Sequence, residues 1–348
     1  MRVLILKISS LGDVVHTLPA ITDAAKAIPG IQFDWVIDEA YTEIARWHPA
    51  VDQLIVFPHR RWRRQLFRAV FKGEFIRLIR DLRKRRYDLI IDAQGQVGKT
   101  MWLAWLAKGE RAGMDWSSVR EPVVSLAYQK KLTIPKGQHA VERLRQLFAK
   151  SLGYQVPSTP GEYGINREER FQTKVDPTRL MFLHGTSWIT KEWPEEYWDQ
   201  LVEIASNSRY DILLTWGNEL EKHRAARLAA GRSNVRVLNR LTVTELAHEM
   251  APCAGIVAAD TGLGHVAAAL SLPTISLYGP TSSGLTGAYG ESQKYIQSEF
   301  ECAPCLQKQC SYNGRSDVQP ACFKEISPAR VWGELMAHLK NSVSRRTD

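Results

Sequence analysis

Cysteine is scarce in this chain, and long hydrophobic runs are missing from it. Five cysteines among 348 residues are too few and too unevenly placed for a disulfide scaffold. No apolar run approaches the roughly 18 residues that a bilayer-spanning helix needs. The opening MRVLILKISS carries an early charge, but its apolar part is too short for a signal peptide. We therefore expect a cytoplasmic protein, whose 44% hydrophobic residues can form a core.

Acidic residues are also in deficit. The chain has 37 aspartates and glutamates against 46 lysines and arginines, which gives a formal net charge of +9. Such an excess indicates an anionic partner, which can be nucleic acid, an anionic membrane surface or a phosphorylated substrate. Composition does not distinguish these three classes of partner, so the positions of the basic residues along the chain have to be considered.

Internal repeats and low-complexity tracts are absent, and short apolar runs alternate with segments of helical length. Runs that are apolar on both faces and separated in this way predict parallel sheets with helical crossovers. The strands expected on this basis span residues 2–8, 33–38, 52–58, 88–93, 181–185, 210–217, 235–239, 255–260 and 274–279.

The strand-helix series is interrupted once. The stretch VPSTPGEYGINREERFQTKVDPT is rich in proline, glycine and charge, and reads as an interdomain linker. We expect an N-terminal Rossmann-like domain, a linker, a second Rossmann-like domain, and a terminal helix opened by a Ser-Pro pair. Their predicted ranges are 1–156, 157–178, 179–326 and 327–348. The fold class is thus α/β, with two doubly wound parallel-sheet domains.

The first strand-to-helix turn carries a lone acid. In KISSLGDVVHTLPA (7–20), Ser9, Ser10, Gly12 and Asp13 follow an apolar strand and precede an amphipathic segment. Ligands of open α/β sheets bind at the carboxyl ends of the strands, where such loops lie. Gly12 is expected to let the backbone turn or approach a ligand closely. Asp13 has two interpretations, a helix cap or a general base, and the segment alone does not decide.

A second turn has the composition of an anion site. In AADTGLGHVAAALSLPT a strand ends at Asp260, and Thr261, Gly262 and Gly264 lead into a helix near His265. Backbone N–H groups of a glycine-bearing loop at a helix N-terminus attract anions, and a diphosphate suits this place. An ordinary tight turn is the alternative.

A third loop, HGTSWITKEWPEEYW, lies between a strand end and a helix. The hydroxyls of Thr186 and Ser187 and the ammonium of Lys191 can hold phosphate oxygens there. A solvated loop lysine is the alternative for Lys191.

The basic excess is concentrated in HRRWRRQLFRAVFKGEFIRLIRDLRKRRYD (59–88). Apolar residues there follow a helical stripe, with arginine and lysine on the opposite face. Concentrated guanidinium groups repel one another and favour phosphate or carboxylate, which arginine binds in a bidentate manner. Nucleic acid would serve equally, although no helix-turn-helix, RRM or KH pattern is present. The densest cluster consists of Arg60, Arg61, Arg63 and Arg64.

Two further patterns suggest other chemistry. AQGQVGKT (93–100) follows a strand and matches a relaxed phosphate loop, which would indicate a nucleotide triphosphatase or kinase. It comes after the fourth expected strand, and no clearly placed acid for Mg²⁺ accompanies it. Near the C-terminus, four thiols make a candidate structural zinc or iron site, with reduced free thiols as the alternative. They are Cys302, Cys305, Cys310 and Cys322.

With KISSLGDVVHTLPA near its start and DTGLGHVAAALSLPTISLYGPT late, the sequence resembles the lipopolysaccharide heptosyltransferases of glycosyltransferase family 9. The segments FDWVIDEAYTEIARWHPAV, HRRWRR, IDAQG, REPVVSLAY and QHAVERLRQLFAKSLGY are most similar to the type I branch. The resemblance covers nearly the whole chain. It implies an inverting, metal-independent transferase of the GT-B fold, whose two domains face each other across a cleft.

The resemblance also implies a reaction and its partners. The donor is ADP-heptose, and the acceptor is the inner Kdo of Kdo2-lipid A, an anionic glycolipid. Peripheral association with the cytoplasmic face of the inner membrane follows, with no required cofactor and no nucleic acid. The four-cysteine segment and the longer tail depart from the type I pattern. A type II or III enzyme acting on another inner-core acceptor is therefore the nearest alternative.

Carried over residue by residue, the family's general base falls on Asp13, and a glutamate that reads the ribose falls on Glu221. Diphosphate contacts fall on Lys191 and on the turn at Thr261. Because base and diphosphate site lie in different domains, catalysis is expected to require closure of the cleft. The full donor set is Ser9, Ser10, Gly12, Thr186, Ser187, Lys191, Glu221, Asp260, Thr261, Gly262, Gly264 and His265. The acceptor set is Arg60, Arg61, Arg63, Arg64, Arg120, His139 and Arg143.

Overall fold

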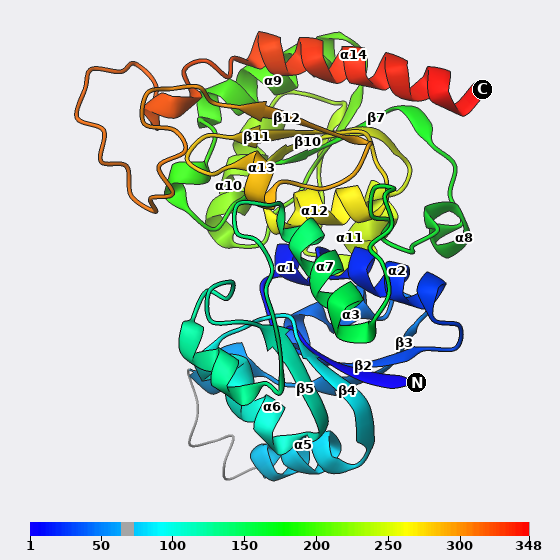
Figure 1. Ribbon diagram of the computed structural model, residues 1–348. Helices are drawn as coiled ribbons and strands as arrows, with labels where there is room; N and C mark the ends of the chain where they lie inside the picture. Colours follow the sequence, from blue (N-terminus) through cyan, green and yellow to red (C-terminus); the bar gives the residue numbers. More distant parts are fainter. Residues whose placement is uncertain (64–72, 348) are drawn as a thin grey trace. The chain divides into compact units, whose positions relative to one another are not determined.

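The computed structural model describes residues 1–63 and 73–347, with only the backbone for 343–347. The chain forms two compact units, Met1–Ile165 and Asn166–Asp348. Each unit is built around its own six-stranded parallel sheet (Figure 1). In the described part of the chain, no helix has both the length and the apolar character needed to cross a membrane.

The first sheet has the strand order β3-β2-β1-β4-β5-β6, and every neighbouring pair is parallel. One face is covered by α2 and α7, and Phe33 packs near Phe148 there. The other face is covered by α5 and α6, whose Leu78, Leu82 and Leu103 join its core. The strands are β1 (Arg2–Leu6), β2 (Gln32–Ile37), β3 (Val51–Val56), β4 (Arg86–Asp92), β5 (Lys108–Met114) and β6 (Lys130–Leu132). The α-helices are α1 (Leu11–Val15), α2 (Leu18–Ala27), α3 (Thr42–Ala45), α5 (Glu74–Arg83), α6 (Trp102–Leu106) and α7 (Ala140–Leu152).

The second sheet has the order β12-β11-β10-β7-β8-β9 and is also wholly parallel. Helices α9, α10 and α14 bury one face in a core that includes Trp193, Trp198 and Phe323. Helices α11 and α12 lie together, and α12 packs on β10 and β11. The strands are β7 (Asp176–Leu183), β8 (Asp211–Leu214), β9 (Val235–Val237), β10 (Cys253–Ala259), β11 (Thr274–Tyr278) and β12 (Gln293–Gln297). The α-helices are α8 (Arg167–Phe171), α9 (Glu195–Asn207), α10 (Glu219–Ala229), α11 (Val243–Met250), α12 (Gly262–Ala269), α13 (Ser283–Thr286) and α14 (Pro328–Thr347).

Both sheets share the Rossmann strand order, in which the first and fourth strands of each unit are neighbours. The order reverses between β1 and β4 in the first unit and between β7 and β10 in the second. At such a switch point the loops leave the sheet in opposite directions and open a crevice at the carboxyl ends. The predicted fold class, α/β with two Rossmann-like parallel-sheet domains, is confirmed.

The sequence analysis did not predict three of the strands, β5, β6 and β12. Their sequences KGERAGM, KKL and QKYIQ are largely polar. β6 and β12 are edge strands, where one side of the strand has no neighbour and apolar character is not required. A search for runs that are apolar on both faces therefore does not find them.

Residues 157–165, at the start of the linker expected from sequence, pack on the first unit. Arg145 of α7 donates hydrogen bonds to the carbonyls of Pro157 and Thr159, at 3.2 and 2.8 Å. Its Nε donates to Asp23 of α2 at 2.6 Å, and both side chains are buried. This buried arginine therefore fastens α2, α7 and the outgoing chain to one another.

Candidate functional site

The first switch point carries Asp13 on the short helix α1, directly after β1. Its Oδ2 accepts hydrogen bonds from the backbone N–H and the hydroxyl of Ser10, both at 2.8 Å. Ser10 is the N-cap of α1, and Asp13, as the third residue of the helix, closes a capping box with it, so the capping interpretation holds in this modified form. The other oxygen, Oδ1, is not used in the cap. Gly12 lies inside the first turn of α1 rather than in the connecting loop.

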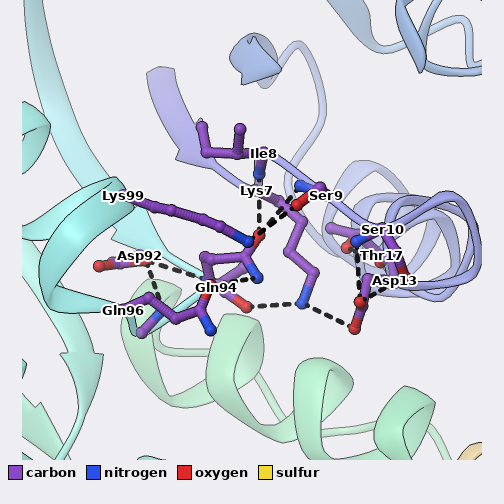
Figure 2. Close-up of polar contacts among 12 residues, drawn as sticks. Lys7, Ile8, Ser9, Ser10, Asp13, Thr17, Asp92, Gln94, Gln96 and Lys99 are labelled. Carbon is purple, nitrogen blue, oxygen red and sulfur yellow. Dashed lines mark hydrogen bonds and ion pairs between the residues drawn. The ribbon is translucent and has the colours of Figure 1, made fainter. Parts of the chain in front are cut away.

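Lys7, which the sequence reasoning missed, faces that second oxygen. Its Nζ lies 3.4 Å from Asp13 Oδ1 and donates to the carbonyl of Ala93 at 3.0 Å (Figure 2). The lysine side chain is 8% exposed, whereas that of Asp13 is 44% exposed. The carboxylate is thus reachable by a ligand while its counter-charge is held beneath it.

This arrangement fixes the ionisation state of Asp13. Burial acts to raise the pKa of the carboxyl, but the charge of Lys7 and the hydrogen bonds from Ser10 outweigh it. The net effect holds the pKa of Asp13 below its ordinary value, because a nearby cation and hydrogen-bond donors favour the charged form. Asp13 is therefore an anion throughout the neutral range.

Gln94, at the end of the neighbouring strand β4, holds the Asp13 loop in place and was also missed. Its Oε1 accepts from the backbone N–H groups of Ile8 and Ser9, at 3.0 and 3.1 Å (Figure 2). Asp92 in turn accepts from the N–H of Gln94 at 2.9 Å and from the hydroxyl of Tyr128 at 2.6 Å. The segment IDAQG was noted in the sequence, but only the order of the strands shows that it lies beside β1 and the Asp13 loop.

The basic cluster is not uniform. Arg61 is occupied, since it pairs with Glu74 at 2.8 Å and with Glu39 at 3.2 Å. Arg60 stacks over the ring of Tyr41 at 4.9 Å, and both Arg60 and Arg63 are exposed. Trp62 between them is buried and donates to Glu74 at 2.8 Å, so it belongs to the core. Arg64 lies outside the described residues, as do Leu66, Phe67, Val70 and Phe71 of the expected stripe.

The other predicted acceptor residues follow β5 and β6, at the side of the sheet opposite to β3. Arg143 on α7 donates to the carbonyl of Ser118 at 2.6 Å and to that of Pro135 at 3.1 Å. It thereby fastens the loop after β5, which carries the exposed Arg120. His139 is the N-cap of α7, and its ring lies 5.3 Å from that of His16 at the end of α1.

The second switch point joins a lysine to an aspartate. Lys191 Nζ, in the loop after β7, lies 2.8 Å from Asp260 Oδ2 at the end of β10. The hydroxyl of Thr281 donates to the same oxygen at 2.5 Å, and Thr186 donates to the carbonyl of Asp260 at 2.8 Å. Lys191 also lies 4.5 Å from the ring centroid of Trp188. Ser187 is exposed beside them.

Helix α12 starts directly after Asp260. Thr261 is its N-cap in extended conformation, and its side chain makes no capping bond. The first N–H groups of the helix, from Gly262 onward, therefore lack a side-chain cap. Gly264 and His265 are buried in the first turn. The eight-residue helix thus presents its positive end close to Lys191.

Glu221 comes to this site from α10, on the other side of β7. Its Oε2 accepts from the N–H of Gly217 at 2.7 Å. A Cβ built on Gly185 would lie only 2.5 Å from the Glu221 carboxyl carbon, so the carboxylate rests against bare backbone. Donor residues from three adjacent strand ends, those of β10, β7 and β8, are thereby brought together in one unit.

Two sequence patterns take other roles in the structure. Within residues 1–63 and 73–347, no group of three or more His, Cys, Asp or Glu side chains is placed to hold a metal ion. The four cysteines are free thiols, and burial together with the neighbouring Cys302, Cys305 and Cys310 raises the pKa of Cys322. In AQGQVGKT, Lys99 donates to the hydroxyl of Ser9 at 3.0 Å.

Comparison with known proteins decides the family. The sequence model of glycosyltransferase family 9 (heptosyltransferase) matches residues 75–315. The lipopolysaccharide heptosyltransferase 1 of Pseudomonas aeruginosa is 49% identical over 97% of this chain and 98% of its own length. This chain belongs to glycosyltransferase family 9. The predicted family and the prediction of a glycosyltransferase are both confirmed.

Other members of family 9 agree with this assignment. The lipopolysaccharide heptosyltransferase 1 of Escherichia coli K12 is 47% identical over 86% of this chain and 95% of its own. The solved structure of E. coli heptosyltransferase WaaC with ADP matches with a TM-score of 0.81 and 46% identity, covering 86% of this chain and 93% of that one. The WaaC structure with ADP-2-deoxy-2-fluoro heptose has a TM-score of 0.79 over the same shares of the two chains, at 45% identity.

Proposed function

We propose that this enzyme transfers L-glycero-D-manno-heptose from ADP-heptose to the inner Kdo of Kdo2-lipid A, with inversion at the anomeric carbon. One observation carries the proposal: a reachable carboxylate at one switch point is matched by a lysine and a helix N-terminus at the other. The relatives named as lipopolysaccharide heptosyltransferase 1, and the WaaC complex with an ADP-heptose analogue, support this choice of donor and acceptor.

In the proposed reaction an acceptor hydroxyl attacks the anomeric carbon of the heptose. A new C–O bond forms there, and the bond to the ADP oxygen breaks and leaves its electron pair on the diphosphate. Asp13 takes the proton of the hydroxyl. A carboxylate with a lowered pKa is a weak base, so the proton moves late, after the leaving group has begun to depart. Positioned base catalysis of this kind contributes typically about 10²–10⁴-fold.

The second unit supplies the stabilisation that the departing ADP requires. The Lys191 ammonium and the N–H groups at the start of α12 are directed at developing negative charge. We propose that they serve in place of a metal ion, and that Glu221 binds the ribose. Lys191 is paired with Asp260, so we propose that the donor diphosphate competes with that carboxylate for the lysine.

Because the base and the diphosphate site belong to different units, the proposed reaction requires both units to engage one pair of substrates. We propose a closing motion for this step. The acceptor's acidic groups are proposed to bind Arg60, Arg63 and Arg120. The acceptor is a lipid of the inner membrane, so peripheral association at its cytoplasmic face is part of the proposal.

A turnover assay tests the proposal and its nearest alternative together. The purified enzyme receives ADP-heptose with either Kdo2-lipid A or an acceptor that already carries heptose, in buffer with EDTA. We expect transfer to Kdo2-lipid A, with an unchanged rate in the chelator and an inverted anomeric product. Transfer only to the heptosylated acceptor would assign the enzyme to a type II or III reaction, and loss of activity in EDTA would overturn metal independence.

A further inference from the structure

Lys99 is a cation of the first switch point that neither the family resemblance nor the base assignment accounts for. It lies on the single π-helical turn Val97–Met101, which follows β4 and its Gln94 loop. Such turns occur frequently at functional sites. Its Nζ donates to the Ser9 hydroxyl at 3.0 Å, and Ser10, the next residue, binds Asp13 (Figure 2).

The charge around Lys99 is unbalanced. Burial, together with the positive charges of Lys7, Arg63 and Arg60, lowers the pKa of Lys99 against the opposing attraction of Asp13. Lys7 is already committed to Asp13 and to the carbonyl of Ala93. A half-buried ammonium among other cations is costly unless an anion compensates it.

Asp13 acts on Lys99 only from a distance, and no carboxylate of the described residues contacts Lys99 directly. Within them its one hydrogen bond goes to a neutral hydroxyl, and no carboxylate lies within 4.0 Å of its Nζ. A direct anionic partner for Lys99 would therefore come from a ligand.

We propose that Lys99 binds the carboxylate of the acid sugar whose hydroxyl is delivered to Asp13. The carboxylate and the reacting hydroxyl of one acid sugar lie within a single ring of each other. That separation suits a lysine and an aspartate connected through Ser9 and Ser10. Lys99 thereby selects an acid sugar and orients its ring. This inference rests on the proposed function, because it takes the acceptor to be such a sugar.

The test uses full-length enzyme and de-acylated Kdo2-lipid A in two forms, with free carboxylates or with methyl esters. Acceptor affinity is measured by calorimetry in the presence of ADP, and transfer is measured with ADP-heptose. A charge-assisted hydrogen bond corresponds to about 10–100-fold in affinity. We expect wild type to bind the acid form tighter than the ester by this factor. K99Q should lose most of this preference, with the remainder due to Arg60, Arg63 and Arg120, and K99R should recover part of it.

K108Q is the matched control, because Lys108 begins β5 at the opposite edge of the same sheet and its loss removes the same charge. It should keep the wild-type preference for the acid form. An equal loss on acid and ester in K99Q, or an unchanged preference, would overturn the role of Lys99. If wild type transfers heptose to neither form, the proposed function itself fails, and the two failures are thereby distinguished.

Discussion

Lys7 Nζ lies 3.4 Å from Asp13 Oδ1 while donating to the carbonyl of Ala93 on the neighbouring strand connection. The lysine therefore links the end of β1 to the end of β4 and places a fixed positive charge under the carboxylate. A carboxylate held in this way stays ionised and reachable, and it is too weak a base to be protonated at neutral pH.

The Lys7–Asp13 contact predicts a change in the pH profile. In K7M the cation that favours the charged carboxylate is gone, while burial still favours the neutral form, so the pKa of Asp13 rises. Activity is lost as pH falls through that pKa, and the acid limb of kcat should therefore move to higher pH. K26M, which removes an exposed lysine at the end of α2, should keep the wild-type profile. An unmoved acid limb in K7M would contradict this account.

Asp13 itself is tested by removal of its basic oxygen. D13N should lower kcat by at least about 10²–10⁴-fold, because the acceptor hydroxyl then has no group to take its proton. Affinity for ADP, measured by calorimetry, should remain close to wild type, since the contacts proposed for the diphosphate and the ribose, Lys191, the start of α12 and Glu221, belong to the second unit. D81N on the exposed side of α5 serves as the control. An active D13N enzyme would show that the base is another group.

Lys191 is expected to hold the donor diphosphate. K191Q should weaken ADP binding by about 10–100-fold, the range for a hydrogen bond to a charged group. K222Q removes a half-exposed lysine of α10 whose acidic neighbour is Glu219, and should leave the Kd for ADP unchanged. Calorimetric titration with ADP distinguishes the two variants. Equal affinities in K191Q and wild type would mean that the α12 N-terminus binds the diphosphate without this lysine.

Gly185 provides a test of Glu221 that leaves the glutamate in the sequence. The Cβ of G185A would lie 2.5 Å from the Glu221 carboxyl carbon, so the side chain has to move away. We expect G185A and E221Q to weaken ADP binding alike. The unfolding midpoint of G185A should change no more than that of a control variant. That control is G333A, where a Cβ meets nothing within 4 Å. Normal ADP affinity in G185A would show that Glu221 does not bind the ribose.

The buried Asp23–Arg145 pair is expected to stabilise the first unit. Both side chains are less than 10% exposed, and the pair also holds the chain at Pro157 and Thr159. D23N removes the buried counter-charge of Arg145 and leaves only the partly exposed Glu142. We therefore expect a loss of stability below the roughly 3–5 kcal/mol that an uncompensated buried charge costs. Urea unfolding followed by tryptophan fluorescence measures the loss. E162Q breaks the exposed pair with Lys26 and should shift the midpoint little.

Much of the fold follows from the sequence because buried parallel strands must be apolar on both faces. Runs such as RVLILKI and DLIIDA are mostly apolar on both faces and can be recognised directly. The glycine and hydroxyl residues after them mark the strand-to-helix turns. The edge strands β6 and β12 carry no such requirement, and the interior strand β5 buries only Ala112 and Gly113, so none of the three shows an apolar run. Asp13, Lys191 and Asp260 were likewise visible as polar residues in the turns that follow apolar strands.

The sequence by itself determined two parallel-sheet units, the positions of their strand-to-helix turns and the residues to be examined there. Only the tertiary structure decided which turns are neighbours. β1 and β4 pair across more than eighty residues, and β7 and β10 across more than seventy. For this reason Lys7 meets Ala93, Gln94 meets the loop before Asp13, and Lys191 meets Asp260. Pairing between parallel strands depends on the order of the whole sheet, and no local property of either strand encodes its neighbour.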